Sequence, residues 1–336
     1  MGEFDLIAKY FKRPARDAAL GVGDDCALLL HTPGTHLAVS CDMLVEGRHF
    51  LSTVAPERLG HKALAVNLSD LAACGATPRA FTLALALPRA DEAWLAGFAQ
   101  GLFALADAHG CELIGGDTTQ GPLNICITVL GDIPIVEGKS QALLRSGAQV
   151  GDDIYVSGTL GDARLALEVF RGRVQVPAAV LEHARRRMEL PTPRVALGLA
   201  LRGLATSAID ISDGFLGDLR HVLHASAVGA QIDLDCAIDL LAAPALSTGS
   251  NVDLMPQISA AQALEWVLAG GDDYELVFTA APAHAHRVAQ AARDAKTRIT
   301  RVGRIEAEMG LRLQGSQGPV QAEKFGSFDH FAPPTK

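Results

Sequence analysis

Acidic residues that stand beside glycine, or directly after a short apolar run, are the groups in this sequence most able to do chemistry. Asp25 and Asp42 are of this kind, and the others lie in the segments Asn67–Asp70, Gly115–Asp117, Ile209–Asp213 and Gly270–Asp273. Because most of them follow apolar runs, we expect them to project from strand ends or turns, where α/β folds gather their ligands. Carboxylate oxygens without His or Cys partners suit Mg²⁺ and do not suit zinc.

Glycine-aspartate pairs occur seven times in the 336 residues, whereas composition alone would give about two. An aspartate beside glycine is usually a turn residue, and an aspartate before a helix is usually its N-cap. We therefore interpret four of these aspartates as turn residues: Asp132, Asp152, Asp162 and Asp218. The other three, Asp24, Asp117 and Asp272, belong to the acidic segments.

Electrostatic repulsion limits the roles that a cluster of such acids can have. Two carboxylates about 4 Å apart repel each other by about 4 kcal/mol at an effective dielectric constant near 20. A cluster of them is tolerable only around cations, and Mg²⁺ that bridges carboxylates to phosphate oxygens is common in phosphoryl-transfer sites. The residues alone therefore predict a site for phosphate groups that uses several Mg²⁺ ions.

Two familiar phosphate-binding motifs are approached but not matched. Gly138, Lys139 and Ser140 resemble the end of a Walker A loop, and Gly131 would be its first glycine. Six residues separate Gly131 from Gly138, whereas a Walker A loop has four residues between its two glycines. The Gly21–Gly23 segment begins a G-x-G pattern without the third glycine. We exclude both as phosphate loops of those types.

Composition argues against two other classes of function. A net charge of −9 and an aromatic content of 5% disfavour nucleic-acid binding. The apolar stretches, such as Leu83–Leu87, are far shorter than the roughly 18 residues that span a bilayer, and the first residues do not resemble a secretion signal. The six scattered cysteines form no C-x-x-C pair, which is typical of reduced thiols. We expect a cytoplasmic protein that binds neither nucleic acid nor membrane.

Helical and strand-like segments alternate along the chain, which predicts an α/β (α+β) protein of two domains. Helices are expected at Pro56–Ala73, Asp91–His109, Asp162–Phe170, Ala178–Glu189, Gly214–Ala227 and Ala260–Leu268. Strands are expected at His36–Cys41, Cys111–Ile114, Ile125–Leu130, Ile154–Ser157, Ala205–Ile211, Gln231–Asp235 and Tyr274–Thr279. Gly131–Gly151 has few periodic apolar residues and predicts the connection, with the domain boundary between residues 138 and 139. Thr248–Met255 and the last few residues are expected to be loops.

The acidic segments stand within longer motifs that follow one another along nearly the whole chain. These include Asp42-Met-Leu-Val-Glu-Gly-Arg-His49-Phe, Leu113-Ile-Gly-Gly-Asp117-Thr-Thr, Ile209-Asp-Ile-Ser-Asp213-Gly and Gly270-Gly-Asp-Asp-Tyr-Glu-Leu. In this order they resemble the motifs of the thiamine-monophosphate kinases, a family of the aminoimidazole-ribonucleotide synthetase-like ATP-binding superfamily.

The resemblance implies a fold, an assembly and a reaction. Residues 1–138 would bind ATP and Mg²⁺ and pair their sheet with that of a second copy, which gives a homodimer. Residues 139–336 would form an α/β domain that completes the substrate site. The implied reaction transfers the γ-phosphate of ATP to thiamine monophosphate and yields thiamine diphosphate and ADP.

The resemblance also assigns roles to single residues. The implied Mg²⁺ ligands are Asp25, Asp42, Asp70, Asp117, Asp210 and Asp213, with a hydroxyl or carbonyl oxygen from Ser40 and Cys41. Gly116, Asp117, Arg145 and Ser212 match ATP-contacting positions, and His49, Asp272 and Phe328 match substrate-contacting positions. Without the resemblance, Arg145 would be interpreted as a surface residue and Phe328 as a core residue, while His49 could be a packed histidine.

Three of these residues depart from the family's usual pattern. Cys41 replaces a frequent Thr, which leaves its backbone oxygen as the better metal ligand. Asp272 replaces the more usual Glu and reaches one methylene less far. Phe328 replaces a common Tyr, so that stacking is retained and any hydroxyl contact is lost.

The implied chemistry needs no general base, because the nucleophile is already a phosphate oxygen. The two substrates together bring roughly six negative charges, so charge neutralisation and positioning should supply the catalysis by direct in-line transfer. Two alternatives stay open: another ATP-dependent member of the superfamily, and a catalytically silent dimer that binds Mg²⁺ and nucleotide.

Overall fold

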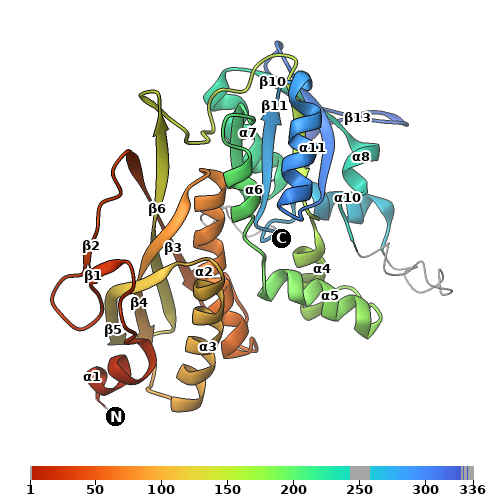
Figure 1. Ribbon diagram of the computed structural model, residues 1–336. Coiled ribbons are helices and arrows are strands. Elements are labelled where there is room, and N and C mark those ends of the chain that lie inside the picture. Colours follow the sequence, from red (N-terminus) through yellow and green to blue (C-terminus); the bar gives the residue numbers. More distant parts are fainter. Residues whose placement is uncertain (1, 243–257, 327, 329–330, 332–336) are drawn as a thin grey trace. The chain divides into compact units, whose positions relative to one another are not determined.

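The computed structural model describes residues 2–242, 258–326, 328 and 331 (Figure 1). The chain forms two compact units, Met1–Ala142 and Leu143–Lys336. This junction lies four residues beyond the boundary expected after residue 138. The expected loop at 248–255 and the last five residues lie outside the described residues. In the described ranges, no helix is both long and apolar enough to cross a bilayer.

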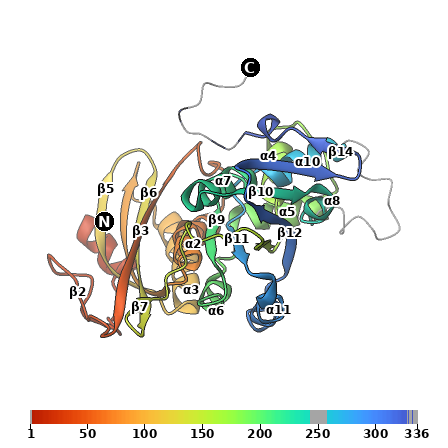
Figure 2. The same ribbon diagram turned by 90° about the horizontal axis from the view of Figure 1, so that it is seen from above.

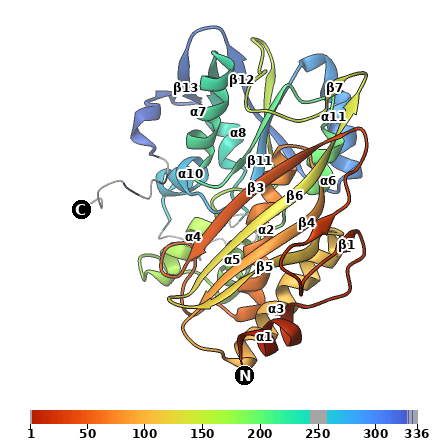
Figure 3. The same cartoon turned by 90° about the vertical axis from the view of Figure 1, so that its left-hand side faces the viewer.

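The first unit is built on a mixed sheet with the strand order β3-β6-β4-β5, and β7 pairs with β6 (Figure 3). Its strands are β3 (Thr35–Val45), β4 (Thr77–Leu87), β5 (Glu112–Gln120), β6 (Asn124–Val136) and β7 (Lys139–Ser140). Strands β4 and β5 are parallel, and β6 is antiparallel to both β3 and β4. A small antiparallel pair, β1 (Ala18–Leu20) and β2 (Leu28–Leu29), follows α1 (Glu3–Leu6) and the π-helical turn η1 (Ile7–Phe11).

Two long helices, α2 (Pro56–Ala73) and α3 (Glu92–Ala108), lie on one face of this sheet (Figure 2). Pro56 begins α2, and the Asp91 carboxylate caps α3 by accepting from the N–H groups of Ala93 and Trp94 at 3.1 Å each. These local signals explain why both helices were predicted correctly from the sequence.

Glycines let α2 and α3 approach each other closely. A Cβ atom at Gly101 would lie 1.8 Å from the backbone oxygen of Glu57, and one at Gly60 would lie 2.0 Å from that of Phe98. Neither contact is sterically possible, so each helix contributes a glycine where the other helix's backbone passes.

The second unit contains a seven-stranded sheet with the order β14-β13-β10-β12-β8-β11-β9. Its strands are β8 (Asp153–Ser157), β9 (Ser207–Ile211), β10 (Gly229–Asp233), β11 (Glu275–Ala280), β12 (Ile299–Glu306), β13 (Gly310–Gly315) and β14 (Gly318–Val320). Only the pair β10 and β13 is parallel among these described strands.

Helices cover both faces of this second sheet (Figure 2). They are α4 (Asp162–Phe170), α5 (Ala178–Glu189), α6 (Val195–Ala200), α7 (Phe215–Ser226), α8 (Leu234–Ile238), α10 (Ala260–Ala269) and α11 (Ala285–Asp294), with short 3₁₀ turns at Pro282–His284 (η3) and Ala322–Lys324 (η4). The main core joins β8 and β9 to α4, α5, α7 and α10. Most of the helices and strands of this unit were expected, whereas α8, α11, β12, β13 and β14 were not.

Several acids stand in regular structure where the sequence predicted strand ends or turns. Strand β3 continues through Asp42 to Val45, and β5 continues through Asp117 to Gln120. The connection expected from Gly131 was also wrong in its first part, because β6 extends to Val136. Strand pairing over long sequence distances holds these residues in register, and no local signal reports it.

Of the four aspartates interpreted as turn residues, one lies in a turn and three do not. Asp152 is the last residue of a turn: its N–H donates to the backbone oxygen of Gln149 at 2.9 Å, and its carboxylate accepts from the N–H of Gln149 at 2.9 Å. Asp132 lies within β6 and forms an ion pair with Arg79. Asp162 is buried in the first turn of α4, and Asp218 is buried inside α7. Tertiary contacts decide the roles of these three acids.

Gly101→Ala should destabilise the protein by about 2 kcal/mol or more, because the new methyl group collides with the backbone of α2. The loss should occur although alanine favours an isolated helix over glycine by about 1 kcal/mol. Urea unfolding of the two proteins measures the difference. Gly121→Ala is the matched control, since its Cβ would make an ordinary 3.6 Å contact with Ala86. Equal stability of both variants would contradict the close packing of α2 and α3.

Candidate active site

In the first unit, β3 and the end of α2 bring Ser40, Asp42 and Asp70 toward one another. The hydroxyl of Ser40 donates to the Asp70 carboxylate at 2.5 Å, and the backbone N–H of Asp42 donates to the Asn67 side chain at 3.0 Å. Because side chains alternate along a strand, Ser40 and Asp42 share the face of β3 toward α2. This face therefore carries three oxygen-bearing candidates for metal binding.

Cys41 lies between these residues in sequence but on the opposite face of β3. It is exposed, and its Sγ atom lies 3.5 Å from Sγ of Cys126 on β6. Its thiol therefore does not share the face of Ser40 and Asp42. Only the backbone oxygen of Cys41 remains as a candidate metal ligand.

Asp117 follows an irregularity in β5. The register with β4 shifts between Phe81 and Thr82, which pair with Leu113 and Gly115, so that Ile114 forms a bulge. Gly116 has a φ of +148°, and a Cβ atom there would lie 1.9 Å from the backbone oxygen of Leu83. Glycine is therefore required at this position, and Asp117 is exposed directly after it.

Two further candidates of the first unit lie in loops. Asp25 is exposed after Gly23, and its N–H donates to the Asp24 carboxylate at 2.8 Å. His49 lies in the loop after β3, where its Nδ1 accepts from the N–H of Val45 at 2.9 Å. Since Nδ1 is an acceptor, the proton of the neutral imidazole lies on Nε2. Buried Lys62 donates to the backbone oxygen of His49 at 3.2 Å and holds the loop.

In the second unit, backbone hydrogen bonds join three segments that are far apart in sequence. The N–H of Asp272 donates to the oxygen of Ser212 at 2.7 Å, and the N–H of Phe328 donates to that of Asp213 at 3.0 Å. The N–H of Tyr274 also donates to the oxygen of Ile211 at 2.9 Å. Four candidates of this unit, Ser212, Asp213, Asp272 and Phe328, therefore share one hydrogen-bonded loop cluster.

Asp210 and Arg145, the other two candidates of this unit, lie outside this cluster. Asp210 is buried on β9, opposite Leu276 of β11. Arg145 is exposed, and its backbone oxygen accepts from the hydroxyl of Ser226 at 3.2 Å at the end of α7. Its guanidinium is thus available to an anion, as an ATP-contacting role requires.

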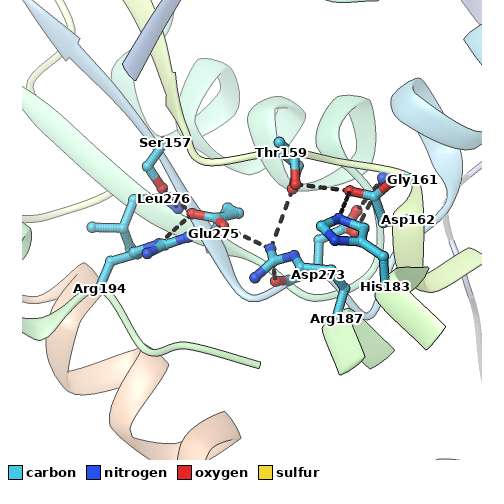
Figure 4. Close-up of polar contacts among 10 residues, drawn as sticks. All are labelled: Ser157, Thr159, Gly161, Asp162, His183, Arg187, Arg194, Asp273, Glu275 and Leu276. Carbon is cyan, nitrogen blue, oxygen red and sulfur yellow. Dashed lines mark hydrogen bonds and ion pairs between the residues drawn. The ribbon is translucent and has the colours of Figure 1, made fainter. Parts of the chain in front are cut away.

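The loop that carries Asp272 has an unusual backbone. Gly271, Asp272 and Tyr274 have φ values of +69°, +63° and +51°. Such values cost energy for residues other than glycine and persist only where the surroundings impose them. Asp273 supplies part of that support, because both oxygens of its carboxylate accept from the N–H of Gly161 at 3.1 Å (Figure 4).

Glu275 supplies the rest of the support from the start of β11. This carboxylate is completely buried and forms ion pairs with Arg187 at 2.7 Å and with Arg194 at 2.5 Å (Figure 4). It also accepts from the hydroxyl of Ser157 at 2.5 Å. Arg187 donates in addition to the backbone oxygen of Asp273 at 3.3 Å. The pair of arginines thus ties the loop to α5 and to the segment before α6.

The sequence did not predict a supporting role for any of these residues, although Asp273 stands in one of the acidic segments that it singled out. Asp273 and Glu275 stand in the motif that drew attention to Asp272, so their positions were a usable signal. Nothing local distinguishes Arg187 and Arg194 from surface arginines, because their partner is Glu275, more than 80 residues away.

The oxygen-rich donor set fits Mg²⁺. Ser40 and Asp70 already place a hydroxyl and a carboxylate in contact, and hard oxygen ligands are the type that Mg²⁺ prefers. Within the described part of the chain, no three His, Cys, Asp or Glu side chains lie close enough together to form a ready-made metal site. Mutual repulsion between carboxylates favours such separation.

Three comparisons with known proteins define the relationship. Models of AIR synthase related proteins match the chain at residues 23–133 for the N-terminal domain and 149–316 for the C-terminal domain. Thiamine-monophosphate kinase of Salmonella typhimurium is 44% identical over 99% of both chains. The chain belongs to the thiamine-monophosphate kinase family. Membership makes it an enzyme of the kinase class and confirms both the resemblance and the two-domain α/β fold.

Solved structures of this family have the same fold. The thiamine-monophosphate kinase of Stenotrophomonas maltophilia has a TM-score of 0.79 and 42% identity, with 92% of this chain and 94% of that chain covered. AaThiL, solved in complex with AMPPCP and TMP, has a TM-score of 0.71 and 26% identity, with 98% of this chain and 97% of that chain covered.

Asp273→Asn should flatten the pH dependence of stability. Burial raises the pKa of Asp273 well above its ordinary value of 3.8, although the N–H of Gly161 and Arg187 oppose the shift. Below pH 3.8 the folded and unfolded chains both hold this proton. As the pH rises, the unfolded chain releases the proton first, so the stability that Asp273 contributes is lost.

Thermal unfolding of the wild type and of Asp273→Asn between about pH 4 and about pH 8 measures this effect. The melting temperature of the wild type should exceed that of Asp273→Asn by most near pH 4, and this difference should shrink as the pH rises. Asp294→Asn, at an exposed position at the end of α11, is the control and should leave the profile unchanged. An advantage that grows with pH would contradict the prediction.

Proposed function

We propose that the chain phosphorylates thiamine monophosphate with ATP and yields thiamine diphosphate and ADP. The observation that carries this proposal is the family match over 99% of the chain, joined to the presence of the acidic motifs in the sequence. AaThiL was solved with AMPPCP and TMP, which supports the same pair of substrates here.

We assign the Mg²⁺ ligands to both units. They are Asp25, Ser40, the backbone oxygen of Cys41, Asp42, Asp70 and Asp117 in the first unit, and Asp210 and Asp213 in the second. When bound, the ions neutralise phosphate oxygens and so reduce the charge that opposes the approach of two anions. The contact between Ser40 and Asp70 supports this assignment.

The substrate contacts that the resemblance implies are part of the proposal. Gly116, Asp117, Arg145 and Ser212 contact ATP, and His49, Asp272 and Phe328 contact thiamine monophosphate. Gly116 is exposed and has no side chain to cover its backbone, and the exposed Arg145 suits a forked contact to phosphate. The Nε2–H of His49 is a donor for a phosphate oxygen.

No side chain is needed to remove a proton from the nucleophile. The attacking atom is an oxygen of the monophosphate. The protein therefore has to hold this oxygen in line with the γ-phosphorus of ATP and to prevent other orientations of the two substrates. A rigid loop at Asp272, tied through backbone bonds to Ser212, suits that task. We propose direct in-line transfer without a phosphorylated enzyme.

The outer face of β3 supports a homodimer. Leu37, Val39 and Met43 alternate along this strand and are 53%, 59% and 51% exposed. A row of exposed apolar side chains on one sheet face marks an interaction surface. We propose that a second copy covers this face.

We also propose that the protein acts in the cytoplasm. All six cysteines, each in the described part of the chain, are free thiols. Reduced thiols are typical of a reducing compartment, which also supplies ATP.

The purified chain with Mg²⁺, ATP and thiamine monophosphate should form thiamine diphosphate, measured by chromatography with ³¹P detection of the diphosphate. ATP binding without this product would contradict the kinase assignment and favour a silent nucleotide-binding dimer. Product from a different phosphate acceptor alone would favour another activity of the superfamily.

Asp117→Asn should lower kcat by about 100-fold or more while the fold persists, because it removes one carboxylate charge from the proposed metal ligands. Steady-state kinetics at saturating Mg²⁺ and circular dichroism measure the two properties. Asp107→Asn is the control, since Asp107 is an exposed acid of α3 that pairs with Arg13 at the surface. Turnover unchanged in Asp117→Asn would remove this residue from the metal site.

Val39→Asp should convert the dimer to a monomer, because a charge at the centre of the apolar row opposes burial. Sedimentation velocity gives the mass of each variant. Met309→Asp is the control, because Met309 is 59% exposed on the second unit. A dimeric Val39→Asp variant would exclude the β3 face as the interface.

A further inference from the structure

One carboxylate oxygen organises the loop that carries Ser212 and Asp213. Oδ2 of Asp218 accepts from three consecutive backbone N–H groups, those of Ser212 at 3.1 Å, Asp213 at 3.1 Å and Gly214 at 3.2 Å. Consecutive N–H groups that converge in this way form a concave binding site for an anion. Here the anion is the protein's own side chain.

The surrounding structure holds Asp218 and the Ser212–Gly214 loop firmly in place. Asp218 is 4% exposed on α7, and its own N–H donates to the oxygen of Gly214 at 3.0 Å. Gly214 has a φ of +119°, and a Cβ atom there would lie 3.0 Å from the backbone of Ala269. The loop therefore turns sharply into α7, while Asp218 accepts from three of its N–H groups and donates to the backbone oxygen of Gly214.

The same loop is held on its other side by the candidate substrate residues. The oxygen of Ser212 accepts from the N–H of Asp272, and that of Asp213 accepts from the N–H of Phe328. Ser212 and Asp213 thus each donate to Asp218 and accept from a segment assigned to thiamine monophosphate. A shift of the loop would move the residues for both substrates together.

We propose that Asp218 is a positioning residue of the kinase site: it fixes the Ser212–Gly214 loop and, through it, the placement of Asp272 and Phe328. This role rests on the proposed function. Asp218 touches neither substrate in this account and acts only through the backbone that it holds. Its loss should therefore weaken binding of both substrates, because three backbone N–H groups, of which that of Gly214 is buried, lose their acceptor and the loop relaxes.

Asp218→Ala and Asp218→Asn test the role, with Asp152→Ala as the matched control. Asp152 is 3% exposed and, like Asp218, accepts from a backbone N–H, in this case that of Gln149. It lies before β8 and accepts from the hydroxyl of Thr206, which precedes β9. The Ser212–Gly214 loop follows the other end of β9, so Asp152 does not hold that loop. Both alanine variants should lose stability. Only Asp218→Ala should raise KM for both MgATP and thiamine monophosphate by about tenfold or more.

Asp218→Asn should restore both KM values to within about threefold of the wild type, because the amide oxygen can still accept the three N–H groups. Should Asp218→Ala fail to fold, Asp218→Glu decides, since its longer side chain displaces the acceptor and should raise both KM values. Wild-type KM values in the Ala or Glu variant, or an equal rise in Asp152→Ala, would overturn the positioning role. A wild-type chain that forms no thiamine diphosphate would overturn the proposed function and this role with it.

Discussion

Repulsion between negative charges is the constraint on which the rest of this structure depends. The chain has a net charge of −9, and its proposed substrates together bring roughly six more negative charges. Carboxylates that serve such substrates must be kept apart or neutralised by cations. The acids of this chain accordingly fall into two classes. Exposed or half-buried acids such as Asp42 and Asp117 can bind cations, whereas buried acids such as Asp218 and Glu275 accept from the protein's own donors.

The buried acids give the site its rigidity. Glu275 binds two arginines, Asp273 binds the N–H of Gly161, and Asp218 binds three N–H groups of one loop. These interactions hold a backbone with positive φ values at Asp272 and Tyr274, which would relax without support. Rigid loops suit a reaction that depends on alignment rather than on proton transfer.

Local chemistry decided how much of the fold the sequence could predict. The bounds of α2, α4 and α5 were predicted correctly, because helix ends carry short-range signals such as Pro56. Strands β3, β5 and β6 were shorter in prediction than in the structure, since their length depends on partners far away in sequence. Three aspartates beside glycine, Asp132, Asp162 and Asp218, were taken for turn residues because turn preference acts locally and their actual partners do not.

The candidate site, too, has a part that the sequence predicted and a part that it did not. Motifs identified the family and the acids, and the cluster of Ser212, Asp213, Asp272 and Phe328 follows from backbone bonds that no motif encodes. Arg187 and Arg194 had no recognisable signal, because their role depends on Glu275, which is more than 80 residues away in sequence. Long-range pairing is therefore the part of the site that needs a structure.

Calorimetric titration of the full chain with ATP, once with Mg²⁺ and once with a chelator, tests the central claim that these acids bind phosphate only through cations. Charge neutralisation by cations predicts measurable ATP binding with Mg²⁺ and an affinity weaker by about 100-fold or more with the chelator. Equal affinity under both conditions would contradict it.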